Sequence, residues 1–204
     1  MALLFLDTTY DVFLGVLDDK YSWLGFKQFS GKKASVVIQK ETFNLCHELG
    51  LKVKDLNGVI TIAGAGFYTG LRLSEGFADI FKAFKIPSYN LYSHEIPKLA
   101  GVVSGVWVTK AYRGEYLFSY WGDFQKTELV TASDITQKIQ AEKIIYIHSQ
   151  SALDELAIRS LNVSISTAEL IQKKPEILEK VVVENWKRES YYFRAPEDEF
   201  KVNP

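Results

Sequence analysis

Apolar and turn-forming residues alternate along the first part of the chain. Residues 2–6, 10–17 and 21–29 are rich in Leu, Val, Phe, Tyr and Trp, and Asp- and Thr-containing clusters separate them. This pattern predicts an antiparallel meander of three strands. The helical and apolar periods that follow predict helix, strand, helix and strand, at about 33–49, 59–63, 70–84 and directly after Pro87.

The remaining residues repeat that order of elements without any sequence identity worth quoting between the halves. Ser133 is expected to cap a short helix, Ser151 with Asp154 to open another, and helical segments to run from Thr167 to about Trp186 with Pro175 between them. The strands predicted in this half are 102–109, 115–121, 127–130 and 143–148.

Two consecutive lobes with the same order of elements predict an α/β protein with mixed sheets. The order is that of the duplicated, ribonuclease-H-like architecture of actin, sugar kinases and heat-shock ATPases, so we expect a two-lobed actin-like fold. The expected lobes are residues 1–92 and 93–204. A fold of this kind hosts several activities, so it does not itself define a function.

Composition narrows the class of protein further. The chain has 24 basic and 25 acidic residues, so no overall positive field is present to hold a polyanion. No apolar run approaches the roughly 18 residues of a membrane span, and MALLFLD has no basic leader and is typical of a first strand. With one cysteine, Cys46, a disulfide framework is excluded. We therefore expect a cytoplasmic protein without a membrane association.

Catalytic chemistry is weakly represented. The first hairpin, Asp7-Thr8-Thr9, offers a carboxylate and two hydroxyls to a metal or phosphate, although these side chains also commonly bond the backbone of their own turn. In the matching hairpin of the second half, Lys110 stands where a second metal-binding acid would be expected, and an ammonium group cannot ligate a cation. A two-carboxylate magnesium site is therefore incomplete.

Other catalytic patterns are weaker still. His47, His94 and His148 lack metal-ligand spacing, and structural roles are expected for His47 and His148. Cys46 falls inside a helix, and no G-x-S-x-G nucleophile turn occurs. The turn Gly64-x-Gly66-x-x-x-Gly70 lacks the Lys-Ser/Thr of a Walker loop.

The residues within that glycine turn carry a resemblance to a known family. Residues 63–72, AGAGFYTGLR, resemble the G-P-G-S-F-T-G-L-R signature of the TsaB (YeaZ) family. Residues 4–8, 54–58, 86–87, 112–117 and 192–197 are similar to further family motifs in the same order. The positions that match are Asp7, Thr8, Gly64, Gly66, Thr69, Gly70, Leu71, Arg72, Gly114, Glu115 and Arg194.

The chain departs from the family pattern at several polar and glycine positions. Ala65 replaces the signature's proline, Phe67 its serine, and Ser74 the glycine that follows it, while Lys110 replaces the acid of the second hairpin. His148-Ser149-Gln150 replaces a G-D-G-like turn. These departures argue further against an ATP site.

The resemblance implies an accessory subunit without its own catalytic site, cofactor or metal. Members of the family pair with TsaD, which transfers a threonylcarbamoyl group to N6 of the tRNA adenosine beside the anticodon, and a P-loop ATPase, TsaE, joins the pair. For this chain the resemblance implies contact with tRNA only through such a complex. It also implies that the two helices of the first lobe form the pairing surface.

The predicted helices have apolar residues outside their core-facing sides, as a partner surface requires. On the first helix, Val36, Phe43 and His47 lie opposite the predicted core residues, and on the second helix Gly76 and Ala83 form a strip of small residues. We expect these five residues to contact a partner. The predicted core residues are Ala34, Ile38, Leu45 and Leu49 on the first helix and Leu73, Phe77, Ile80, Phe81 and Phe84 on the second.

Three other functions remain open at this point. A small actin-like or sugar-kinase-like ATPase would use Asp7, a homodimeric protein would use the same two helices, and a peptidase would need a nucleophile and base that the sequence does not supply. Basic and aromatic residues alternate between Lys187 and Arg194 in a pattern that also occurs in RNA-binding segments. Neighbouring acidic residues cancel much of that charge, so we expect this segment to dock on the body of the protein.

Overall fold

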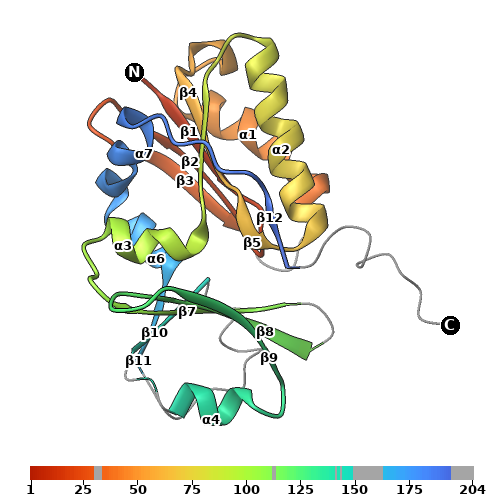
Figure 1. Cartoon of the computed structure of the whole chain (residues 1–204). Coiled ribbons are helices and arrows are strands. Elements are labelled where there is room, and N and C mark those ends of the chain that lie inside the picture. The colour runs from red at the N-terminus through yellow and green to blue at the C-terminus, as the bar shows by residue number, and fades with distance from the viewer. Residues whose placement is uncertain (30–33, 112–113, 141, 143, 149–162, 194–204) are drawn as a thin grey trace, which may run out of the picture.

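Two five-stranded sheets, each with its own helices, form the upper and lower parts of the molecule (Figure 1). The computed structural model describes residues 1–29, 34–111, 114–140, 142, 144–148 and 163–193. The helix predicted to open at Ser151 and the motif residue Arg194 lie outside these ranges. No helix among the described residues combines the length and apolarity needed to cross a membrane.

The first sheet has the strand order β3-β2-β1-β4-β6, with β1 antiparallel to β2 and parallel to β4. Its predicted strands and helices are all present, with ends shifted by one or two residues. The bounds are β1 Leu3–Asp7, β2 Val12–Leu17, β3 Trp23–Phe29, α1 Ala34–Glu48, β4 Gly58–Ile62, α2 Tyr68–Ala83 and β6 Ser88–Leu91.

The second sheet repeats this arrangement in the order β9-β8-β7-β10-β11, with two antiparallel pairs followed by two parallel ones. The predicted repeat of three strands, helix and strand is therefore confirmed in space. The bounds are β7 Gly105–Lys110, β8 Glu115–Trp121, β9 Lys126–Thr131, α4 Ile135–Gln140, β10 Ile144–Ile147 and β11 Val163–Ser166.

Both faces of the first sheet are covered by helices, which explains why its central strands are continuously apolar. In β1, Leu4 and Leu6 face α1 and α2, while Leu3 and Phe5 face the opposite side. That opposite side is covered by segments from the end of the chain: α6 Thr167–Lys173, η4 Pro175–Leu178 and α7 Glu179–Val183. The last helices therefore pack on the first sheet (Figure 1).

Several short elements were not predicted, and some of them lie where the two parts meet. A hydrophobic cluster lies between the lobes and joins Ala65 to the buried Trp107 and to Tyr191. After β11 the chain crosses back to the first sheet. The boundary between lobes after residue 92 remains a prediction. The unpredicted elements are η1 Val53–Asp55, β5 Gly64–Gly66, η2 Ser93–Glu95, α3 Ile96–Leu99, β11 and β12 Tyr191–Tyr192.

The core side of α2 is narrower than the periodicity predicted. Phe77 and Phe81 are buried, and Leu73 is partly buried against the same cluster, as expected. Ile80 and Phe84 were also predicted to face the core, and this was wrong: they are 49% and 75% exposed. The buried residues of α2 form a stripe that includes Ser74, Phe77 and Phe81, and Ile80 and Phe84 lie at the edge of that stripe.

Substitution of Leu178 tests whether the last helices stabilise the first lobe. Leu178→Ala should lower the free energy of unfolding by about 2–5 kcal/mol in urea denaturation, because Leu178 is fully buried against the first sheet. Val183→Ala is the matched control: Val183 is exposed, so the change should be within about 0.5 kcal/mol. Equal effects of the two substitutions would contradict this packing.

Candidate functional site

The glycine turn after β4 is packed against other segments of the same chain. A Cβ atom at Gly66 would lie 2.7 Å from Thr9 Cβ, and one at Gly70 would lie 2.1 Å from the Thr8 carbonyl oxygen. At Gly64, where φ is +127°, a Cβ atom would lie 2.5 Å from the backbone oxygen of Tyr191. Close backbone approach within the chain therefore accounts for all three glycines.

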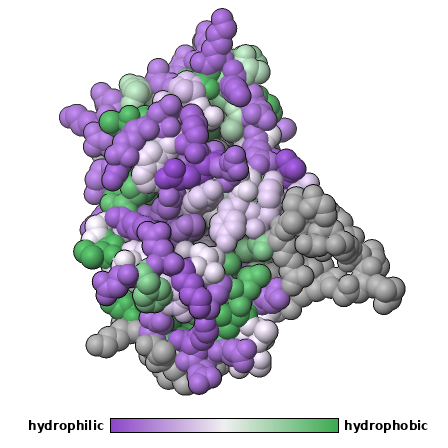
Figure 2. All heavy atoms as spheres, in the orientation of Figure 1, coloured by the Kyte–Doolittle hydropathy of each residue, from purple (hydrophilic) through white to green (hydrophobic). Residues whose placement is uncertain are grey.

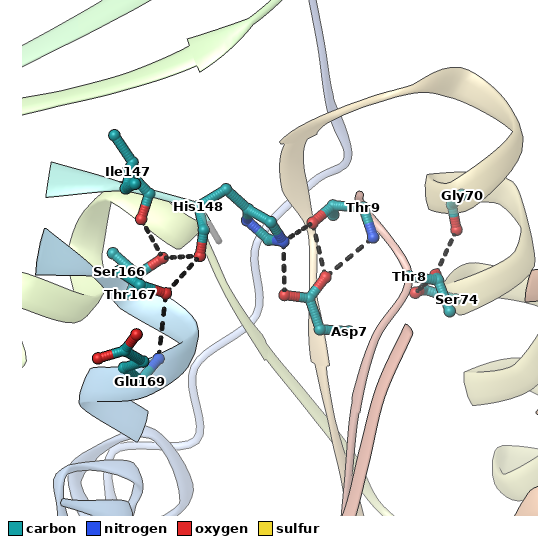
Figure 3. Close-up of polar contacts among 10 residues, drawn as sticks. All are labelled: Asp7, Thr8, Thr9, Gly70, Ser74, Ile147, His148, Ser166, Thr167 and Glu169. Carbon is teal, nitrogen blue, oxygen red and sulfur yellow. Dashed lines mark hydrogen bonds and ion pairs between the residues drawn. The ribbon is translucent and has the colours of Figure 1, made fainter. Parts of the chain in front are cut away.

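Thr8 joins the first hairpin to α2 and explains one departure from the family pattern. Its hydroxyl donates to the Gly70 carbonyl oxygen at 2.7 Å and lies 2.6 Å from the Ser74 hydroxyl (Figure 3). Since the Thr8 proton is directed at Gly70, Ser74 is the donor of the second bond. The serine that replaces the family's glycine is thus buried with a partner.

The Asp7 carboxylate lies between the two sheets, with Thr9 and His148 as its polar neighbours. Its Oδ1 accepts from the Thr9 amide at 2.9 Å and from the Thr9 hydroxyl at 2.6 Å. Its Oδ2 lies 3.3 Å from Nε2 of His148, which follows β10 in the second lobe (Figure 3). Asp7 and His148 are both buried, so these contacts replace water around the carboxylate.

The start of α6 fixes the position of His148. The His148 carbonyl oxygen accepts from the Ala168 amide and the Thr167 hydroxyl, both at 3.1 Å, and from the Ser166 hydroxyl at 3.3 Å. Ser166 is also the N-cap of α6, because its side chain accepts from the Glu169 amide. The imidazole ring is therefore held at the lobe boundary by the same residues that begin the helix.

This arrangement does not form a nucleophile, base and acid in series. Thr9 Oγ1, 3.4 Å from His148, and Asp7 Oδ2 both approach the same ring nitrogen, Nε2. In a hydrolytic triad the acid holds one ring nitrogen while the other faces the nucleophile. The Thr9 proton is directed at Asp7, and Thr9 is 2% exposed, so neither activation nor substrate access is provided.

A pocket of about 490 Å³ lies beside the first hairpin, between the starts of α1 and α2. None of the described residues that line it carries a charge, so they offer no cation to neutralise a phosphate. Among the described residues, no three His, Cys, Asp or Glu side chains gather as metal ligands. The pocket is lined by Thr8, Thr9, Tyr10, Ala34, Ser35, Phe67, Thr69, Gly70 and Leu73.

The other signature residues support α2. Leu71 is fully buried, and Thr69 is exposed at the pocket rim. The Arg72 guanidinium donates to the Tyr68 hydroxyl at 3.2 Å and to Glu75 at 3.0 Å. It also lies over the rings of Tyr68 and Tyr192, so in this structure Arg72 braces the helix against the end of the chain.

The second-lobe motif residues lie apart from this turn. Gly114 has φ +79°, a conformation that favours glycine, and Glu115 begins β8 directly after it. The predicted functional set is therefore divided. The structure brings Asp7, Thr8, Gly66 and Gly70 together and leaves Gly114 and Glu115 at the β7–β8 hairpin.

Residues 186–193, which we call the C-terminal strap, dock on the first lobe as predicted. β12 pairs with β5 in parallel, and the Tyr191 amide donates to the Ala63 carbonyl oxygen at 2.8 Å. Arg188 forms a bidentate pair with Glu95, with nitrogen–oxygen distances of 2.9 to 3.2 Å. Ser190 donates to Glu75 of α2. The Arg188 guanidinium and the Ser190 hydroxyl are therefore bonded within the chain, whereas an RNA-binding segment would leave such groups accessible to RNA.

The five predicted partner residues are all exposed, and we call their faces of α1 and α2 the helical surface. Val36 is 73% exposed and Phe43 is 62% exposed, and the Phe43 and His47 rings stack at a centroid distance of 6.3 Å. Gly76 and Ala83 are exposed on α2. The apolar side chains on this surface are therefore not used within the described lobe. Their contact with a partner stays a prediction.

Comparison with solved structures identifies the class of fold. The chain resembles YeaZ from Pseudomonas aeruginosa with a TM-score of 0.60 at 14% identity, covering 87% of this chain and 92% of YeaZ. It resembles an uncharacterized protein with similarity to peptidase YeaZ from Pseudomonas aeruginosa with a TM-score of 0.56 at 14% identity, covering 85% and 91%.

A third similar structure is the ethanolamine utilization protein EutJ from Carboxydothermus hydrogenoformans, with a TM-score of 0.50 at 12% identity, covering 87% of this chain and 89% of EutJ. No protein-family model and no curated protein sequence matches the chain. These findings confirm the two-lobed actin-like fold. The fold is that of YeaZ over most of both chains.

The sequence predicted a structural role for His148. It did not predict that His148 contacts Asp7. The available signal was position: Asp7 and His148 each stand at the carboxyl end of an interior strand, in lobes with the same strand order. Such ends face a shared crevice in α/β proteins.

The contact between Asp7 and His148 should contribute strongly to stability. His148→Ala should lower the free energy of unfolding by about 3–5 kcal/mol, because the Asp7 carboxylate would remain buried without its second partner. In Asp7→Asn/His148→Ala the charge is removed as well, so the loss should be smaller than the sum of the single losses. Urea denaturation of the four proteins measures this, and additivity within about 0.5 kcal/mol would contradict it.

His94 should make stability depend on pH. Burial lowers the pKa of His94 to about 4, with Lys98 and Arg188 also lowering it and Glu95 opposing them. The ring stacks on Tyr92, and its Nδ1 has no hydrogen-bond partner among the described residues. Because the unfolded pKa is about 6.5, the unfolded state binds more protons between these values. Stability is therefore lost as pH falls from 6.5 towards 4.

The expected slope is about 1 kcal/mol per pH unit within that window and near zero above it. His94→Phe keeps an aromatic ring beside Tyr92 but cannot titrate, so its stability should depend less on pH. Urea denaturation of both proteins at several pH values gives the difference. Parallel curves for the two proteins would show that His94 is not the group responsible.

Proposed function

We propose that this protein is a TsaB-like accessory subunit that pairs with a TsaD-like catalytic subunit. The observation that carries the proposal is the exposed apolar face of α1 and α2, which begins beside the signature turn of a YeaZ-like fold. The ordered set of family motifs supports the same conclusion. In the pair, the TsaD-like subunit transfers threonylcarbamoyl to N6 of the tRNA adenosine beside the anticodon.

The helical surface has the composition of an interface between helices. Phe43 is a large aromatic side chain that is mostly exposed, and aromatic residues commonly contribute most to binding energy when a partner covers them. Gly76 presents no side chain, and a Cβ atom placed there would meet no heavy atom within 4 Å. A partner helix can therefore approach α2 closely and form a two-chain helical bundle.

A supporting role without catalysis agrees with the chemistry of the crevice. Both Asp7 oxygens have partners within the chain, and the Thr8 and Thr9 hydroxyls are bonded internally. These groups hold the hairpin, the glycine turn and the second lobe together. In this proposal a TsaE-like P-loop ATPase joins the pair and tRNA contacts this chain only within the complex. A cytoplasmic location follows from such a role.

Co-expression with a TsaD subunit from the same genome tests the proposal. The two chains should co-purify, and Phe43→Asp or Gly76→Arg should reduce recovery of the complex at least about tenfold, because each places a charge or a bulky side chain in the interface. Val103→Asp is the control, since Val103 is 87% exposed and lies next to the second sheet. Retention of the complex by both helix variants would contradict the assigned surface.

The same preparation separates the alternative functions. The isolated chain should show no magnesium-dependent ATP hydrolysis that Asp7→Asn abolishes; such an activity would favour an ATPase instead. A homodimer that persists when the TsaD subunit is present, and that Phe43→Asp disrupts, would favour a homodimeric protein. Light scattering of each mixture distinguishes the homodimer from the complex with the TsaD subunit.

A further inference from the structure

A second apolar feature lies at the far end of α2, beyond the helical surface. A pocket of about 330 Å³ separates the last turn of α2 from η1. Phe81 forms a buried wall, whereas Ile80, Phe84 and Val53 are partly or largely exposed. The pocket is lined by Val53, Lys54, Ile80, Phe81, Phe84 and Ile86.

Backbone hydrogen bonds hold the walls of this pocket in place. The chain leaves α2 through Lys85, which has φ +60°, and the Ile86 amide donates to the Phe81 carbonyl oxygen at 3.0 Å. On the other wall, the Asp55 side chain accepts from the Lys52 amide at 2.9 Å, and the Asp55 amide donates to the Lys52 carbonyl oxygen at 2.8 Å. A preformed concavity loses little conformational entropy when a ligand enters it.

Lys54 lines the pocket, and Lys52 and Lys85 are direct neighbours in the chain of the lining residues Val53 and Phe84; we call these three lysines the lysine rim. Hydrophilic residues predominate over this upper end of the molecule (Figure 2). All three are exposed, and none forms an ion pair with a described residue.

Two acids lie close to the lining residues in sequence. The Asp55 carboxylate accepts from the Lys52 amide, and the helical period places Asp79, like Lys82, on the side of α2 turned away from the pocket-lining residues. The pocket therefore presents an apolar floor with a surplus of positive charge around it.

We propose that this lysine-rimmed pocket binds a protein segment in which a bulky aliphatic or aromatic side chain is flanked by Asp and Glu residues. The apolar side chain enters between Phe84 and Val53, and the acidic residues contact the lysine rim. A lipid bilayer is less suitable, because a flat surface contacts projecting side chains, whereas the apolar surface here is concave. A small pocket of this kind binds a partner by enclosing one of the partner's side chains.

The inference goes beyond the proposed function and does not depend on it. Ala83 of the helical surface and the pocket share the last turn of α2, but the pairing is tested at Phe43 and Gly76 and the pocket at Lys54, Phe84 and Lys85. The two therefore require different variants. A peptide that binds at the pocket of the isolated chain identifies the site whether or not a TsaD-like subunit forms a complex.

Fluorescence anisotropy with three labelled peptides tests the pocket on the full chain. The probe is a Glu-rich peptide with two Leu residues one helical turn apart; the comparison peptides replace both Leu by Ser, or all Glu by Lys. The first peptide should bind at least about tenfold more tightly than the other two, and its affinity should fall as salt rises from about 0.05 to 0.3 M because the lysine rim is exposed.

Protein variants then locate the binding. Lys54→Glu/Lys85→Glu and, separately, Phe84→Ser should each weaken binding of the first peptide at least about tenfold. Lys20→Glu/Lys174→Glu is the matched control: it makes the same change of net charge at exposed lysines outside the rim and should leave the affinity within about twofold. Phe43→Asp should also leave peptide binding unchanged.

Three results would overturn the inference. They are equal binding of all three peptides, no binding of the first peptide at about 1 mM, and equal weakening by the rim variant and its control. Binding of anionic phosphatidylserine vesicles that depends on Lys54 and Lys85, without binding of the first peptide, would assign the rim to a membrane surface instead. Failure of the TsaD complex with intact peptide binding would reject the proposed function alone.

Discussion

The Asp7 carboxylate, buried where the two sheets meet, is the constraint on which the arrangement of the molecule depends. A carboxylate removed from water needs polar partners, and here Thr9 supplies two donors while Nε2 of His148, from the other lobe, lies 3.3 Å from Oδ2. The first hairpin is thereby held in one conformation. Thr8 can then bond α2, and the glycines of the signature turn can approach the hairpin closely.

Because of these contacts, the polar groups in the crevice between the two lobes bond to other segments of the same chain. In a nucleotide-binding relative of this architecture, the same strand ends would have to leave oxygen ligands and backbone amides for phosphate and metal. In this chain they are used between segments, and the C-terminal strap covers the edge of β5. The exposed apolar surfaces of the first lobe lie outside the crevice, on α1 and α2 and beside η1. This division agrees with a protein that acts through partners.

The sequence predicted the elements well because apolar period and turn residues are local signals. It predicted the duplicated order, the strand–turn–helix around Gly64 to Gly70 and the exposed side of α1. It did not predict β5 and β12, because two- and three-residue strands carry no periodic signal and form only where distant segments meet. Ile80 and Phe84 were assigned to the core because helical period states which residues share a face, not how much of that face the rest of the protein covers.

The sequence by itself determined the two-lobed fold, the resemblance to the TsaB (YeaZ) family and the lack of a standard catalytic motif, since these depend on residue order and spacing. Tertiary structure alone decided that His148 reaches Asp7, that Ser74 partners Thr8 and that the last helices cover the first sheet. Each of these is a contact between residues more than 60 positions apart. No local pattern specifies such a contact, because it exists only after both lobes have packed.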